Sequence, residues 1–583
     1  MSRAKKRAQM ERVDALRRRS TPARNQIIDE YSAGKMTRRE FLRRGSILGM
    51  SLPMMGFLAS ACSPEGAATT TTAAAGTTLT TAAPGTTSPA PSTTGAPAGP
   101  TTVRAAFFAP AGPIDPVLAN DEGRLAVLGQ TAQYLTFSDA ELNLRPVLAE
   151  SWEPNETFDV WTFNLRQGVL YHDGSEVVAD DVVASIRGIA EGNAASAFGT
   201  FGVTPDSVSA VDQYTVQFTL ERPSGSFPFF VSSDNYNAVI LPTAFWEGYA
   251  EGSYEAEFPG SGPWVMESHE PGVSAAFVKN ENYWDDNSGQ PDRLELLFFA
   301  DEAPAVTAFQ EGRIDAIPHV SFSGGQAIID TPDATTSSIS TAQHRQIYFD
   351  TSAPPFEDVR VRQAIALTLD RQTLIDGLVG GFGVIGNDHP IWSLFPVYNP
   401  DAVAQREADL ATAQQLLDAA GFGDGLEAPL DVLEFFEVED LAQLVQASAA
   451  QLNGVNLTVG VYDAGTYYED YWLAAASSMG IVNYGHRGVP DVYLGAPLLS
   501  DGTWNASHWV NETYDDLFSQ YSQAPDLDTQ RSLAGEIQTL LNEEVPFMVP
   551  YFVDHISVTK PNFTGMEVTG MGHVNLVQSG FSS

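Results

Sequence analysis

Residues 160–165, Val-Trp-Thr-Phe-Asn-Leu, alternate apolar and polar side chains, and residues 214–220, Tyr-Thr-Val-Gln-Phe-Thr-Leu, do the same. This period of two predicts two strands, each with one buried face. Between them, apolar residues recur at helical spacing behind Asp180 and Asp181, whose carboxylates favour the start of a helix. Strands therefore alternate with helices in this part of the chain.

Two later stretches have helical periodicity. The apolar residues of 361–378 predict one long amphipathic helix, and those of 410–420 predict a second helix that ends at Gly421. No internal repeat appears in residues 103–583, and about 480 residues are too many for one small core. The fold class is therefore α/β or α+β with at least two lobes.

The start of the chain is typical of an exported protein. Residues 37–43, Thr-Arg-Arg-Glu-Phe-Leu-Arg, precede an apolar run over 45–61 that ends directly before Cys62. Twin arginines before a short apolar run predict an export signal over 1–61, and Cys62 would take a lipid as the new N-terminus. The alternative interpretation is an N-terminal membrane anchor. Under either interpretation, everything after Cys62 lies outside the cytoplasmic membrane.

Residues 63–102 consist almost entirely of Thr, Ala, Ser, Pro and Gly, so no packed core can form there. We expect a flexible tether, and about 40 such residues have a root-mean-square reach of about 35 Å. Residues 1–62 hold 14 basic and 5 acidic residues, which leaves 17 basic and 68 acidic residues after Cys62, a net charge near -51. Such a surface repels phosphate polymers and anionic headgroups, so nucleic-acid binding is not expected and membrane attachment must come from lipid.

The chemistry-bearing residues are sparse. Cys62 is the only cysteine and the nine histidines are scattered singly, so the sequence predicts no disulfide, no cofactor and no protein-only metal site. No nucleophile elbow, phosphate loop or His-Glu-x-x-His helix is present, and no pattern favours hydrolysis by paired carboxylates. The sequence therefore predicts a protein that is not an enzyme.

A series of short motifs carries a family resemblance. These motifs are 144–152 (LRPVLAESW), 161–169 (WTFNLRQGV), 172–174 (HDG), 179–182 (ADDV), 260–264 (GSGPW), 280–284 (NENYW), 309–316 (FQEGRIDA), 358–365 (DVRVRQAI) with 370–371 (DR), and 544–550 (EVPFMVP). In this order, the chain resembles the family 5 extracellular solute-binding proteins, the oligopeptide, dipeptide and nickel receptors of ABC importers.

The resemblance implies an α/β, two-lobed, three-domain periplasmic-binding-protein fold with hinged lobes. One discontinuous lobe would comprise 103–128, 258–344 and 543–583, with a small domain over 129–257 inserted into it. The other lobe would comprise 345–542. A ligand would be enclosed between the lobes as they rotate about the strands that cross between them.

The implied function is capture of a peptide-like solute and its delivery to the permease of an ABC importer. The protein would be a monomer on the outer face of the cytoplasmic membrane, held by lipid, or in the periplasmic space. The alternatives are the same fold binding an oligosaccharide, a metal chelate or another non-peptide solute, a sensory receptor, and a hydrolase.

The resemblance also suggests where the ligand binds. Peptide receptors pair backbone groups at the lobe junction with an extended ligand, and Tyr348, Phe349 and Asp350 lie where the first crossing is expected. The alternative is that Tyr348 and Phe349 belong to the core of the crossing strand. Trp392 lies in a loop where the family has pocket residues, and it is a candidate lid.

Residues 483–491, Asn-Tyr-Gly-His-Arg-Gly-Val-Pro-Asp, depart from the family pattern. Peptide-binding relatives have a stretch resembling Gly-Trp-x-Ala-Asp-Tyr-x-x-Pro, whose aspartate pairs with the ligand's α-ammonium group. Here, beside Tyr484, His486 or Arg487 occupies that place, and a guanidinium matches carboxylate or phosphate. We therefore expect a ligand with an anionic, amidated or carbohydrate group. The alternative is that Asp491 or Asp350 pairs with an ammonium and Arg487 pairs with a surface acid.

Overall fold

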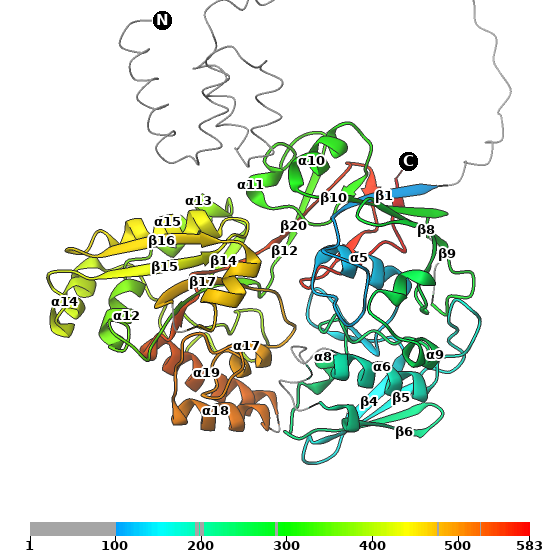
Figure 1. The fold of residues 1–583 in the computed structure, drawn as a ribbon, viewed down its shortest axis with the longest axis horizontal. Coiled ribbons are helices and arrows are strands. Elements are labelled where there is room, and N and C mark those ends of the chain that lie inside the picture. Colours follow the sequence, from blue (N-terminus) through cyan, green and yellow to red (C-terminus); the bar gives the residue numbers. More distant parts are fainter. Residues whose placement is uncertain are drawn as a thin grey trace, which may run out of the picture. The chain divides into compact units, whose positions relative to one another are not determined.

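A computed structural model describes residues 101–192, 198, 203–285, 290–474, 477–524 and 526–582 (Figure 1). The predicted signal, Cys62 and nearly all of the predicted tether lie outside these residues. The described chain contains two seven-stranded sheets, a four-stranded sheet and three two-stranded sheets. Each large sheet organises one lobe.

The first lobe is built on a sheet whose strand order is β12-β20-β11-β1-β10-β9-β8. Its central strands β1 and β10 are parallel and pair from Thr102 with Arg293 to Phe108 with Phe299. The bounds of its strands are β1 Thr102–Phe108, β8 Trp264–Glu270, β9 Ser274–Lys279, β10 Arg293–Phe299, β11 Ala316–Ile317, β12 Thr335–Ile339 and β20 His555–Thr559. Its helices are α5 Glu122–Thr131, α10 Glu302–Gln310 and α11 Phe322–Gly325.

The four-stranded sheet belongs to the segment predicted as an insertion, and its order is β4-β5-β7-β6. The predicted strands and helix are confirmed as β5 Val160–Leu165, β7 Thr215–Thr219 and α6 Ala179–Gly192. Alternation places Trp161, Phe163 and Leu165 in the core. The remaining elements of this segment are β2 Thr136–Ser138, β3 Leu144–Pro146, β4 Ala149–Pro154, β6 Val208–Asp212, α8 Phe227–Phe230 and α9 Thr243–Glu247.

The second lobe is built on a sheet of order β14-β19-β13-β17-β15-β16, with β18 paired to β13. Helices α12, α14 and α15 contribute buried side chains to the core of this sheet. The strands are β13 His344–Phe349, β14 Gly383–Ile385, β15 Glu427–Leu433, β16 Asn456–Tyr462, β17 Met479–Tyr484, β18 Phe547–Met548 and β19 Tyr551–Val553. The helices are α12 Val359–Ala366, α13 Arg371–Leu378, α14 Leu410–Ala420, α15 Val438–Ala449, α16 Ala464–Thr466, α17 Asp491–Gly495, α18 Glu512–Ser522 and α19 Leu527–Glu544.

The predicted single helix over 361–378 is wrong, because the chain forms α12 and α13 instead. Asp370 adopts an extended backbone between them, and its side chain accepts a hydrogen bond from the Thr373 N–H, so it caps a new helix. The predicted helix over 410–420 is confirmed as α14, and Gly421 ends it at a φ of 89° in the left-handed region.

The chain crosses between the lobes twice, and the crossings are hydrogen-bonded to each other. The Thr341 hydroxyl donates to the Val553 carbonyl (2.6 Å), and the Val553 N–H donates to the Gln343 carbonyl (2.8 Å). Because β18 and β19 belong to the second sheet, the return crossing follows Val553, whereas the sequence analysis placed the boundary at residue 543. After β20, the strands β21 Phe563–Thr564 and β24 Gly580–Phe581 pair with each other, and they enclose the hairpin of β22 Glu567–Val568 and β23 Val574–Asn575.

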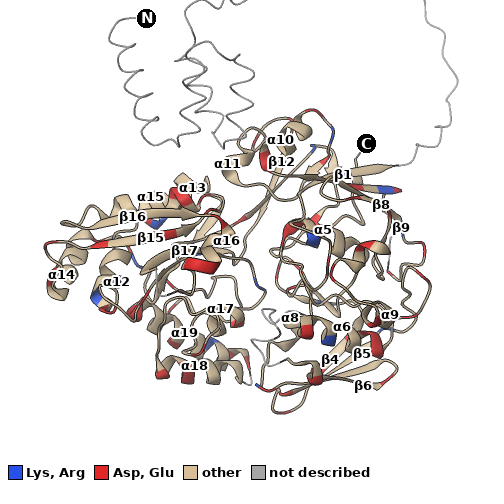
Figure 2. Cartoon of the chain, in the orientation of Figure 1, with Lys and Arg blue, Asp and Glu red and all other residues tan. Residues whose placement is uncertain are grey.

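Acidic residues are more frequent than basic ones along the described chain (Figure 2). None of the helices in the described ranges is both long enough and apolar enough to cross a membrane.

The buried carboxylate of Asp388 provides a test of the second lobe's stability. It is fully buried and accepts hydrogen bonds from Arg371 Nη2 (2.7 and 2.8 Å) and Arg406 Nε (2.8 Å). Asp388→Ala leaves two guanidinium groups without their counter-ion, so we expect the free energy of unfolding to fall by about 3 to 5 kcal/mol. Urea denaturation measures this loss. Asp528→Ala is the control, because the exposed Asp528 should change stability by less than about 0.5 kcal/mol.

Candidate solute-binding site

A cavity of about 650 Å³ lies between the lobes and is lined by residues of both. We call it the interlobe cavity. The first lobe contributes Phe107, Phe108, Asn120, Asp121, Glu122, Leu125, Tyr236, Pro318, His319, His555, Gly570, Met571, Gly572 and Val574. The second lobe and its crossing contribute Gln343, Glu434, Phe435, Phe436, Asn483, Gly485, His486 and Arg487. The volume is typical of small-molecule sites.

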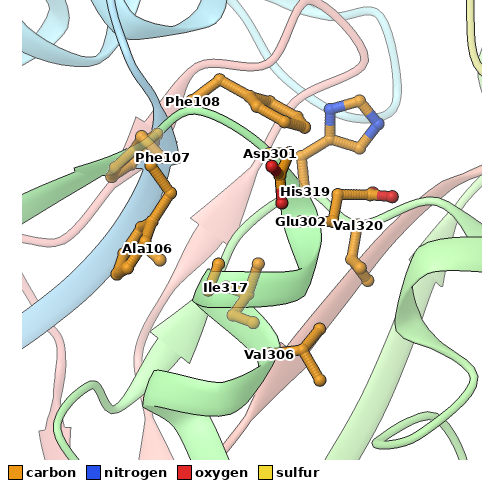
Figure 3. A pocket seen from close by; sticks show the side chains of 11 residues that line it. Ala106, Phe107, Phe108, Asp301, Glu302, Val306, Ile317, His319 and Val320 are labelled. Atoms are coloured by element: carbon orange, nitrogen blue, oxygen red, sulfur yellow. The ribbon is translucent and has the colours of Figure 1, made fainter. Parts of the chain in front are cut away.

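Aromatic rings make up much of the cavity wall. Phe436, from the second lobe, lies 6.2 Å from the ring of Phe108 and 6.0 Å from that of His319, both from the first lobe. Its φ of 38° is in the left-handed region, an uncommon conformation for a bulky residue. Figure 3 shows Phe108 and His319 where they also line a smaller neighbouring pocket. The bent loop therefore holds an aromatic side chain of one lobe against the other lobe.

His486 is 5 % exposed and its ring is tightly enclosed. Its Nδ1 accepts the backbone N–H of Ala342 (2.9 Å), so the proton of the neutral ring is on Nε2. Burial, reinforced by the charge of Arg487, lowers the pKa of His486 to about 3. Gly570 packs so closely on the ring that a Cβ there would lie 2.7 Å from three ring atoms. His486 therefore offers an N–H donor and no positive charge.

Arg487 is half-buried beside His486. Its Nη1 donates to the His486 carbonyl (2.7 Å) and lies 3.8 Å from the Met571 sulfur, and its guanidinium is 6.0 Å from the ring centre of Tyr236. Nε is buried without a hydrogen-bond partner, and no carboxylate of the described residues forms an ion pair with this guanidinium. The positive charge of Arg487 therefore lacks a counter-ion at bonding distance.

Asp234 reaches the same loop from the inserted segment. A Cβ on Gly488 would lie 1.9 Å from Asp234 Oδ2, so the glycine makes room for this carboxyl group. Burial raises the pKa of Asp234 to about 7, although Ser138, Arg487 and the Gly488 N–H each lower it. Asp234 is thus a group near Arg487 that titrates close to neutral pH.

A second polar group lies on the first lobe. His319 Nδ1 donates to Glu122 Oε2 (3.2 Å), and the rings of His319 and His555 stack with centres 4.2 Å apart. His555 Nε2 donates to the Pro318 carbonyl (3.0 Å). Although histidines and carboxylates line the cavity, no group of three or more His, Cys, Asp or Glu in the described residues is arranged to hold a metal ion.

The predicted site residues fall into two groups. His486 and Arg487 line the interlobe cavity, whereas the others do not. Tyr348 and Phe349 are buried in β13 within the core. This is the placement that the alternative interpretation described.

The remaining predicted residues are buried and do not line the cavity. Trp392 is 1 % exposed and meets His486 edge-on at 6.0 Å, while Tyr484 stacks on His344 at 5.4 Å. The two aspartates that the alternative interpretation paired with an ammonium are also buried. Asp350 accepts from the Ser352 hydroxyl (2.6 Å), and Asp491 Oδ2 accepts from the hydroxyls of Ser226 (3.2 Å) and Tyr521 (3.4 Å).

Sequence reasoning missed Glu122, Phe436 and Met571. Glu122 resembled any acidic residue at a helix start, and Phe436 resembled core sequence between β15 and α15. One signal was available for Met571, since glycines flank it on both sides in an otherwise ordinary hairpin.

The model of the bacterial extracellular solute-binding proteins, family 5 Middle, matches residues 143–506. The chain belongs to this family. Among curated relatives, heme-binding protein A of Haemophilus influenzae is 26% identical over 71% of this chain and 79% of its own length. The periplasmic murein peptide-binding protein MppA of Escherichia coli is 24% identical over 78% of this chain and 88% of its own length.

Solved structures agree on the fold. The Listeria monocytogenes ABC transporter substrate binding protein CtaP has a TM-score of 0.72 at 21% identity and covers 83% of this chain and 99% of its own. HbpA2 from Haemophilus parasuis has a TM-score of 0.70 at 22% identity and covers 83% of this chain and 100% of its own. The two-lobed α/β periplasmic-binding-protein fold predicted from sequence is thereby confirmed.

The raised pKa of Asp234 makes stability depend on pH. The folded carboxyl keeps its proton up to about pH 7, whereas the unfolded one loses it near pH 4, so the contribution of Asp234 to stability falls as pH rises between these values. The free energy of unfolding of the wild type should fall between pH 5 and pH 8 by on the order of 2 kcal/mol more than that of Asp234→Asn. Urea denaturation at both pH values measures this difference. A constant difference would contradict the prediction, and Asp528→Asn, an exposed site, should show none.

Proposed function

We propose that this protein is an exported receptor that captures a peptide-like solute in the interlobe cavity and delivers it to an ABC importer. The observation that carries the proposal is the unpaired guanidinium of Arg487 inside a cavity of about 650 Å³ lined by both lobes. Curated relatives include a murein peptide-binding protein, a dipeptide-binding protein and an oligopeptide-binding protein, and their names support a peptide as the solute.

The proposed mode of binding uses charge at one end of the cavity and apolar contact along its walls. The Arg487 guanidinium would donate hydrogen bonds to a carboxylate or another anionic group of the solute, because its planar fork matches such groups. The His486 Nε2–H would supply a neutral donor beside it. Binding would draw the lobes together about the paired crossings without chemical turnover, and the permease would recognise that arrangement.

The proposed location follows from the sequence before residue 101. A twin-arginine signal would direct export, and a lipid on Cys62 would hold a monomeric receptor at the outer face of the cytoplasmic membrane. The Thr- and Ala-rich tether would let the two lobes reach a permease close to the anchor. Mass analysis of the N-terminal peptide of the exported protein tests the lipid directly.

A second candidate function is binding of a non-peptide solute with an apolar body. The rings of Phe108, Phe435 and Phe436 favour it, since they offer contact area and few hydrogen-bonding groups. Relatives named for heme and, with the word probable, for deoxycholate show that the family name alone does not define the solute.

Native mass spectrometry separates these functions. The full-length protein is purified from its exporting host without denaturation, and the small molecules that dissociate from it are identified. We expect short peptides of several sequences, because backbone and terminal groups would dominate recognition. A single apolar non-peptide solute would overturn the peptide assignment and establish the second candidate. Release of a chemically altered solute over time would indicate an enzyme.

Arg487→Ala tests the anionic contact. We expect affinity for the co-purified solute to fall about 10- to 100-fold, equivalent to about 1.4 to 2.7 kcal/mol for the loss of a charge-assisted contact. Isothermal titration calorimetry measures the change. Arg313→Ala is the control, since that arginine is exposed and pairs with Glu311 at 2.8 Å. Unchanged affinity in Arg487→Ala would remove this residue from the binding site.

A further inference from the structure

Two acidic side chains, Asp121 and Glu122, line the interlobe cavity at the start of α5, and they differ in whether their oxygens have partners. Asp121 is the N-cap of α5, accepting the Arg124 N–H, and its Oδ2 lies 3.1 Å from Arg124 Nη1. Within the described chain, Glu122 is hydrogen-bonded only to His319, through Oε2, and its Oε1 is buried without a hydrogen bond. The charge of Asp121 is therefore compensated within the protein, and one oxygen of Glu122 is not.

The opposite charge faces the cavity from the other lobe. Arg487 follows β17 and has no ion pair within the described chain, and its Nε is also buried without a partner. His486 adds a donor but no charge, because burial keeps its ring neutral. The interlobe cavity thus has a carboxylate on its first lobe and a guanidinium on its second.

Two unsatisfied polar atoms support a ligand here. Glu122 Oε1 and Arg487 Nε are each buried without a hydrogen-bond partner among the described residues. A buried polar group without a partner costs about 1 to 3 kcal/mol, which a bound solute would recover. His486 lies beside Arg487 on the cavity wall, and its Nδ1 is already used by the Ala342 N–H.

Apolar groups occupy the wall between the two charges. The Met571 sulfur lies near Arg487, and the neighbouring Gly572 approaches Leu125, which is one turn beyond Glu122 on α5. Phe108 and Phe436 add aromatic surface from both lobes. A solute that fits this cavity has opposite charges at its two ends and an apolar middle.

We propose that the interlobe cavity binds a zwitterionic solute, such as a short apolar peptide with free termini, with its carboxylate at Arg487 of the second lobe and its ammonium at Glu122 of the first. This assignment rests on the proposed function and adds the polarity of the bound solute. The two charges of the solute would then connect the lobes, so that each end alone binds weakly.

Three chemically matched peptides test which end of the solute binds at which residue. The probes are trileucine with free termini, its N-acetyl form and its C-terminal amide, titrated by calorimetry into full-length wild-type protein freed of co-purified solute by dialysis. We expect each modification to weaken binding to the wild type by 10-fold or more; we call this loss of affinity, relative to free trileucine, the N-acetyl penalty or the amide penalty. In Glu122→Gln the N-acetyl penalty should fall below 3-fold while the amide penalty persists. In Arg487→Gln the amide penalty should fall below 3-fold while the N-acetyl penalty persists.

Two variants make the result specific. Asp528→Asn is the control, because Asp528 is an exposed acid that does not line the cavity, and it should leave both penalties as in the wild type. Arg487→Lys keeps a positive charge and should keep part of the amide penalty. A variant that weakens all three probes equally, or penalties that Glu122→Gln and Arg487→Gln leave unchanged, would overturn the assignment.

The two proposals fail in different ways. If the wild type binds free trileucine but the penalties do not follow Glu122 and Arg487, the polarity is wrong and the peptide receptor stands. If the wild type binds no free peptide and native mass spectrometry finds a non-peptide solute, both proposals fall.

Discussion

The hydrogen-bonded pair of crossing strands is the constraint on which the rest of the structure depends. Because the links from β12 to β13 and from β19 to β20 bond to each other through Thr341, Gln343 and Val553, the two lobes share one narrow connection. Everything else that joins the lobes comes from side chains and loops. Such an arrangement leaves rotation about the connection as the low-energy motion of the molecule.

Charge placement marks the loops that line the interlobe cavity as a candidate binding site. Buried ions in proteins are normally paired, as Asp388 is with Arg371 and Arg406, because removing a charge from water without compensation is costly. In one cavity of the described chain, Glu122 Oε1 and Arg487 Nε are instead buried without a hydrogen-bond partner, and they come from different lobes. Polar atoms left without a partner in this way are expected where a protein binds its ligand.

Much of the fold could be predicted from sequence because its signals are local. Period-two alternation defined β5 and β7, and Gly421 defined the end of α14. The break between α12 and α13 was missed because apolar spacing continues through it, and only the capping geometry of Asp370 reveals the second helix start. Residues 547–553 were placed in the wrong lobe because strand partnership across the molecule leaves no local pattern.

The binding site was less predictable for a physical reason. The unusual stretch around His486 and Arg487 could be recognised because it replaces an expected aspartate, and both residues do line the cavity. Glu122 and Phe436 are far from this stretch in sequence, and only the packing of the lobes brings them to the same cavity. A residue's type predicts its chemistry, but its neighbours come from the fold.

The edge-on contact between Trp392 and His486 has a practical consequence. The indole is sealed from water in the core of the second lobe, one ring away from the cavity, and the imidazole between them is hydrogen-bonded to Ala342 of the crossing. A change in occupancy or in lobe rotation alters the electric field at that indole. We therefore expect the fluorescence of Trp392, one of nine tryptophans in the chain, to respond to occupancy without an attached dye.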